Sequence, residues 1–159
     1  MIGRRRAVLA PVLVAAAVLT GCGSGSQGGG PARISVSEAY IPLPASPTDA
    51  AGYLTLHNTG GTDDQLVKVG SPDARQVTMH RSTATSMAAL PELPVPAHGS
   101  AAFTRGGDHL MIMGLAHRPT LGSTVRLDLT FARSGTITVK VPIKPLAYRP
   151  SDAGTASGS

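Results

Sequence analysis

Residues 124–144 read TVRLDLTFARSGTITVKVPIK, and this stretch decides the fold class. Apolar side chains occupy alternate positions on both sides of Ser134-Gly135, with mainly polar or charged side chains between them. A period of two is that of a β-strand with one buried face, whereas an amphipathic helix repeats about every 3.6 residues. A Ser-Gly pair between two such runs is typical of a turn. The stretch therefore predicts a β-hairpin with one face in a core.

Shorter alternations of the same kind precede this hairpin and are separated by glycine- and aspartate-rich connections. They cover Tyr53–His57, Gln65–Val69 and Arg75–His80. Three prolines within residues 90–97 predict an irregular or edge segment there, because proline cannot donate to a sheet ladder. No window shows three turns of amphipathic helix. The sequence thus predicts an all-β chain, a two-sheet β-sandwich, with a single domain at residues 33–148.

The N-terminus has the pattern of a lipoprotein leader. A basic segment, MIGRRR, precedes 13 uncharged apolar residues (7–19), which is too short for a membrane-spanning helix of about 20 residues. Leu19-Thr20-Gly21-Cys22 then forms a lipobox. We therefore expect a signal peptide at 1–21, a lipidated Cys22 that begins a Gly/Ser-rich tether at 22–32, and a disordered tail at 149–159.

Charge and cysteine content exclude several classes of function. Without Arg4, Arg5 and Arg6 the 14 basic residues become 11, against nine acidic ones, so the mature formal charge is +2. No basic patch is interleaved with aromatics and there is no tryptophan, so nucleic acid is not an expected partner. Cys22 is the only cysteine, and acylation would consume it. An intrachain disulfide and a thiolate-dependent blue copper site are therefore excluded.

Four methionines of the mature chain cluster between residues 79 and 113, and two histidines lie beside them. His109-Leu110-Met111 is the sharpest part of this cluster. On a strand, residues two apart point to the same face with Cα atoms roughly 7 Å apart, so the imidazole and the thioether can share one ion. Thioether sulfur is soft and neutral, and imidazole also serves copper, which favours Cu(I). Zinc would normally bring a Cys or carboxylate ligand.

The stretch GGDHLMIMGL (106–115) resembles the signature of the PCu(A)C periplasmic copper chaperone family, formerly a domain of unknown function. The resemblance extends through YLTLHN (53–58), DQLVKV (64–69) and LDLTF (127–131). It implies a cupredoxin-like fold and one Cu(I) per chain, held by His80, Met87, His109 and Met111. The six residues between His80 and Met87 are fewer than the family usually has, so Met87 would reach the metal differently. Arg105 stands where proline is frequent.

The remaining histidines and methionines have simpler interpretations. Met79 should face away from His80 and pack in the core. Met113 shares a face with Met111, and packing is favoured for it too. Single histidines at 57, 98 and 117 are expected to be surface or hydrogen-bonded residues. The C-terminal tail lacks His and Met, so we predict no second copper site there.

The resemblance also implies a role for the chain. It would be an extracytoplasmic metallochaperone, anchored to the outer face of the cell membrane, delivering copper to the CuA centre of cytochrome c oxidase subunit II or to its assembly factors. A monomer without enzymatic activity is expected, since no catalytic constellation is visible. Copper scavenging or buffering is one alternative. A metal-free lipoprotein module that binds proteins is another.

Overall fold

The computed structural model describes residues 29–150, and this part of the chain is built from β-strands without an α-helix. Its strands are β1 (Ile34–Pro42), β2 (Ala50–Asn58), β3 (Asp64–Gly70), β4 (Ala74–Ser82), β5 (Met87–Ala89), β6 (Leu93–Val95), β7 (Gly99–Phe103), β8 (Asp108–Leu115), β9 (Thr124–Phe131) and β10 (Gly135–Lys144). Across these residues there is no helix that is both long and apolar enough to cross a membrane. The all-β prediction is confirmed.

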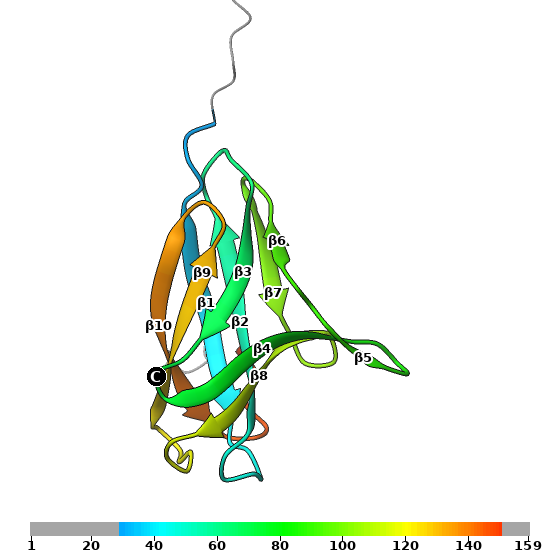
Figure 1. Cartoon of the computed structure of the whole chain (residues 1–159), viewed down its shortest axis with the longest axis vertical. Coiled ribbons are helices and arrows are strands. Elements are labelled where there is room, and N and C mark those ends of the chain that lie inside the picture. Colours follow the sequence, from blue (N-terminus) through cyan, green and yellow to red (C-terminus); the bar gives the residue numbers. More distant parts are fainter. Residues whose placement is uncertain (1–28, 151–159) are drawn as a thin grey trace, which may run out of the picture.

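The strands form a sandwich with a lateral arm (Figure 1). One layer holds β1, β2 and β7, and the other holds β10, β9, β3 and β6. The layers join where the end of β1 pairs in parallel with the end of β10. The first residues of β2 pair instead with β8, which carries β4 and β5 away from the body. This continuation of the sheet, β8-β4-β5, is called the arm below.

The β9–β10 hairpin supplies much of the core, as its alternation predicts. The two strands pair antiparallel from Gly135 opposite Phe131 to Pro142 opposite Thr124. Every second side chain of β9 from Val125 to Phe131 is at most 6% exposed. These side chains meet Leu54, Leu56, Leu66, Phe103 and Leu110 from the other strands in one apolar cluster. The proline-rich segment at residues 90–97 contains β6, which is the last strand at one end of the sheet order. The predicted edge strand is therefore also confirmed.

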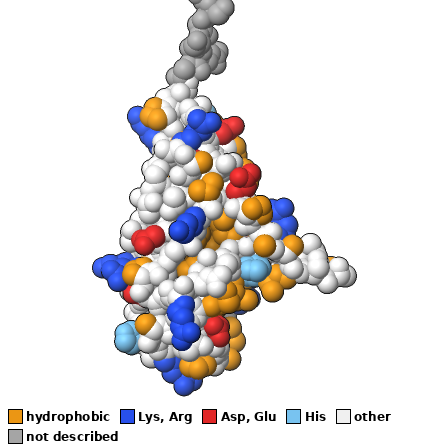
Figure 2. Space-filling view, in the orientation of Figure 1, with side chains coloured by type: hydrophobic (Ala, Val, Ile, Leu, Met, Phe, Trp, Pro, Cys, Tyr) orange, Lys and Arg blue, Asp and Glu red, His pale blue; other side chains and the backbone are white. Residues whose placement is uncertain are grey.

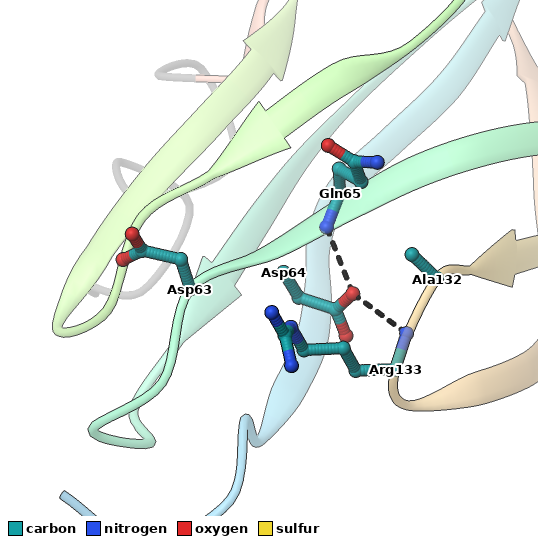
Figure 3. Close-up of a pocket in the computed structure, with 5 residues that line it drawn as sticks. All are labelled: Asp63, Asp64, Gln65, Ala132 and Arg133. Atoms are coloured by element: carbon teal, nitrogen blue, oxygen red, sulfur yellow. Dashed lines mark hydrogen bonds between the residues drawn. The ribbon is translucent and has the colours of Figure 1, made fainter.

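Asp64 ties the start of β3 to the turn between β9 and β10. Its carboxylate accepts hydrogen bonds from the backbone N–H groups of Gln65 and Arg133 (Figure 3) and from the backbone N–H and the hydroxyl of Ser134. Burial opposes ionisation of this carboxyl, but the four hydrogen bonds outweigh it and hold its pKa below the ordinary value of 3.8. Asp64, Gln65 and Arg133 line a surface pocket, and because the Asp64 carboxylate is already hydrogen-bonded within the protein, its role there is structural.

The segments predicted for the leader and the lipid lie outside the described residues, and so do Cys22 and the tail beyond 150. The last tether residues are visible. The carbonyl of Gly30 accepts hydrogen bonds from the N–H of Gly61 and the hydroxyl of Thr62. Residues 30–32 therefore lie against the loop between β2 and β3, and the chain meets the body at that end of the sandwich.

Candidate metal centre

The two central histidines face each other across the arm. β4 and β8 pair antiparallel, and in this register His80 lies directly opposite His109. Paired residues project to the same face of a sheet, and the two imidazole rings stack with centroids 5.9 Å apart and planes inclined by 21°. The other face is apolar, since Leu110 and Ile112 of β8 are fully buried. β8 thus packs Leu110 and Ile112 into the core and presents His109 outward.

Hydrogen bonds define which imidazole nitrogens are available. In His109, Nδ1 lies 3.1 Å from the carbonyl oxygen of Gly107. A carbonyl only accepts, so Nδ1 carries the proton and the lone pair is on Nε2. In His80, Nε2 lies 2.9 Å from the Thr78 hydroxyl, whereas the buried Nδ1 has no hydrogen-bond partner. When Nε2–H donates to Thr78, the Nδ1 lone pair is left for a metal.

The two predicted methionine ligands lie on the same outer face, on either side of the histidine pair. Met111 lies opposite Thr78, two residues along β8 from His109, and is partly buried. Met87 lies on β5 opposite Ser82, two residues further toward the tip of the arm than His80. The structure thus brings His80, His109 and Met111 into one neighbourhood and leaves Met87 at its outer edge, with 54% of its surface exposed.

The short gap between His80 and Met87 explains the position of Met87. Residues 83–86 form a tight turn in which the N–H of Thr83 donates to the carbonyl of Ser86 (2.8 Å). The residues between His80 and Met87 therefore form a tight hairpin, and Met87 lies on strand β5 rather than on a long loop. Its flexible thioether side chain must turn toward His80 to share a metal with it. Figure 2 shows apolar side chains beside a histidine at the base of the arm, and a tip without charged side chains.

The other sulfur and imidazole groups are placed apart from this neighbourhood or at its end. Met79 is 7% exposed and packs in the core, as predicted. Met113 shares the face of Met111 as predicted, but it is partly buried at the surface rather than in the core cluster. His57 is hydrogen-bonded to Ser37 (2.8 Å), and His98 and His117 are exposed. Among residues 29–150 no group of three or more His, Cys, Asp or Glu is placed to hold a metal.

Two contacts stabilise the surroundings of the histidines: one joins β4 to β8, and the other fixes the loop that precedes β8. Arg81 and Asp108 lie opposite each other next to the histidine pair, and the guanidinium donates to both carboxylate oxygens (2.8 and 2.9 Å). This bond lowers the pKa of Asp108, although burial opposes the effect. The Arg105 guanidinium lies over the neighbouring rings of Tyr40 and Tyr53, 5.9 and 5.8 Å from their centroids, and donates to the carbonyl of Leu146. It thereby holds the loop that supplies the Gly107 carbonyl.

Sequence reasoning missed the partners of the imidazoles. Thr78 stands two residues before His80 on the same strand face, a spacing that marks it as a candidate hydrogen-bond partner. Arg105 carried no such signal, because its aromatic and carbonyl contacts come from distant segments of the chain.

Residues 34–143 match a protein family described as putative lipoprotein LpqE-like. The match covers more than half of the chain. The chain belongs to this LpqE-like family. A putative lipoprotein of Leifsonia xyli subsp. xyli, Lxx21020, is 28% identical over 116 residues, which are 70% of this chain and 69% of that protein.

Solved structures similar to this LpqE-like chain are PCuAC domains and their relatives. The apo PCuAC domain of PmoF2 has a TM-score of 0.62 at 20% identity, covering 76% of this chain and 96% of that domain. The copper-bound PmoF2 domain has a TM-score of 0.63 at 20% identity, covering 73% and 96%. CuI-DR1885 from Deinococcus radiodurans has a TM-score of 0.58 at 28% identity, covering 78% and 85%. The resemblance to the PCu(A)C family and the cupredoxin-like β-fold are thereby confirmed.

Proposed function

We propose that this chain is an extracytoplasmic lipoprotein that binds one Cu(I) as cargo and passes it on. The observation that carries the proposal is the pair of facing imidazoles, of which His80 keeps a buried Nδ1 without a hydrogen-bond partner. A buried polar atom without a partner is costly unless a ligand satisfies it. Met111 lies on the same face two residues along β8 from His109, and Met87 lies on that face opposite Ser82.

The chemistry of these donors favours Cu(I). Two imidazoles and two thioethers supply soft and borderline ligands without a negative charge, which suits Cu(I) better than Zn²⁺ or hard cations. The donor atoms also differ in accessibility. Met87 is 54% exposed and lies nearest the tip of the arm, so it is the ligand that an accepting protein can displace first. A neutral donor set with one exposed ligand fits a carrier, which must release its metal.

The expected acceptor is a membrane protein, and the CuA centre of cytochrome c oxidase subunit II or its assembly factors is the client that the family resemblance implies. A lipid on Cys22 would keep the carrier beside such a client and raise its effective concentration there. Membership of a lipoprotein family supports this anchor.

Cu(I) titration of the protein against a chromophoric Cu(I) chelator tests the binding. We expect one ion per chain, and we expect His109→Ala or Met111→Leu to lower the affinity by more than about 100-fold, since partners of ligands alone change it about 10–100-fold. His117→Ala is the matched control, because His117 is exposed and away from the site. Unchanged affinity in His109→Ala and Met111→Leu would refute the site.

X-ray absorption and a transfer assay complete the test. Nitrogen and sulfur scatterers at about 2.0 and 2.3 Å are the expected shells, by analogy with other His and sulfur ligands. Mixing the Cu(I)-loaded protein with the apo CuA domain and separating the two should leave copper on the CuA domain. Copper retained by this chain would favour the buffering role instead.

A further inference from the structure

The soft donors of the arm lie in one line along the sheet. His109, Met111 and Met113 occupy alternate outward positions of β8 and are all partly buried. Across the sheet His80 of β4 pairs with His109, and Met87 of β5 lies at the level of Ser82, two residues nearer the tip. Each step along β8 is two residues, or roughly 7 Å, whereas Met87 lies two strands across the sheet from β8. From the body to the tip of the arm the order is therefore sulfur, sulfur, imidazole pair, sulfur.

Met113 lies at the end of this line nearest the body, and its side chain lines a surface hollow. The hollow is also lined by Asp49, Arg75 and Gly114. The Arg75 side chain lies over Gly114, where an added Cβ would meet its Cγ at 2.9 Å. Asp49 and Arg75 carry opposite charges, so their formal charges cancel. The thioether of Met113 is thus the soft donor that an ion in the hollow would meet.

We propose that Met113 and Met111 form a loading position from which Cu(I) moves to the histidine pair by exchanging one ligand at a time. This inference rests on the function proposed above. Met111 and Met113 are two residues apart on one face, as His109 and Met111 are, so the geometry that lets one pair share an ion serves the other pair equally.

The transfer step is a simple ligand exchange. The bond from Cu(I) to Met113 Sδ breaks while a bond to the Nε2 lone pair of His109 forms, and Met111 holds the ion throughout. No electron moves, and in the neutral imidazole the hydrogen bond from Nδ1–H to the Gly107 carbonyl leaves the Nε2 lone pair for the ion. Two neutral thioethers bind Cu(I) more weakly than a set that includes imidazole, so the ion moves toward the histidines.

Rates and affinities of Met113→Leu test the loading position, with Met79→Leu as the matched control. Met79 lies on the same arm but faces the core. Uptake of Cu(I) from a chromophoric chelator, followed by stopped flow, should be about tenfold slower in Met113→Leu, equivalent to about 1.4 kcal/mol in the barrier. Its equilibrium affinity for one Cu(I) should match that of the unmodified protein. Met79→Leu should change neither quantity.

Methyl NMR of ¹³C-labelled methionine gives a second measurement, since Cu(I) is diamagnetic. With Cu(I) in excess of one equivalent, the Met113 methyl resonance should shift, and that of Met79 should not. Normal tight binding with an unshifted Met113 methyl and an unchanged uptake rate in Met113→Leu would overturn the loading position alone. Absence of Cu(I) binding to the unmodified protein would overturn both this inference and the proposed function.

Discussion

Replacing Thr78 with valine tests whether the hydrogen bond to His80 prepares this imidazole for copper. The change is isosteric and keeps a β-branched residue in β4, but it removes the hydroxyl that lies 2.9 Å from Nε2. Without it, Nε2–H loses its acceptor and nothing fixes the tautomer that leaves the buried Nδ1 with a lone pair. A neutral hydrogen bond contributes about 1 kcal/mol, and partners of metal-bound histidines change affinity about 10–100-fold. Because the Thr78 hydroxyl is neutral, its effect should lie at the lower end of this range, and we expect the Cu(I) affinity to fall about tenfold.

Competition titration with a Cu(I) chelator measures this loss, and long-range ¹H–¹⁵N NMR of the imidazoles reports the tautomer. Thr78→Ser should restore both the affinity and the His80 resonances, because it returns the hydroxyl. Thr138→Val is a suitable control, since Thr138 is an exposed threonine that bonds to Asp128 on β9. Affinity of Thr78→Val equal to that of the unmodified protein would refute the assigned role of Thr78. A His80 tautomer with the proton on Nδ1 would do the same.

Three further changes probe the core, the anchor and the lipid. Leu127→Ala removes a fully buried side chain and should cost about 2–5 kcal/mol of unfolding free energy, measured by urea denaturation. Asp64→Asn should cost on the order of 2 kcal/mol at pH 7 through weakened hydrogen bonds to a charged acceptor. Because the pKa of Asp64 is lowered in the folded protein, its contribution to the free energy of unfolding is complete at neutral pH and is lost as pH falls below 3.8. The difference in unfolding free energy between Asp64→Asn and the unmodified protein should therefore shrink in acid. A difference that stays constant with pH would contradict this. Cys22→Ser should release the protein from the membrane fraction, as phase separation in detergent would reveal; retention would argue against lipidation.

Much of the fold could be predicted because its signals are local. The alternation in residues 124–144 gave the hairpin and its buried face without knowledge of any partner strand. β7 escaped prediction because GSAAF (99–103) has small residues and no alternation, and its extended form depends on pairing with β2. The anchoring role of Asp64 also depends on residues about 70 positions away, so no sequence window contains it.

For the candidate site too, features that depend on local spacing could be predicted, and features that depend on strand register or loop folding could not. The spacing of His109 and Met111 placed both on one strand face, since this follows from the two-residue period alone. The opposition of His80 to His109 requires the register between two strands, and the family resemblance supplied what spacing could not. The position of Met87 depended on how a six-residue gap folds. A tight hairpin, rather than a loop over the site, leaves this methionine on an exposed strand.

The alternation in the middle of β8 separates core packing from the proposed metal binding within one segment. Leu110 and Ile112 are fully buried in the core, whereas His109 and Met111 face outward and are proposed ligands. Substitution of His109 or Met111 should therefore alter metal binding with little effect on folding. A one-residue insertion or deletion within the strand would exchange the two sets and impair both at once. Divergence among relatives should accordingly proceed here by substitution, and length changes should accumulate in the turns at either end.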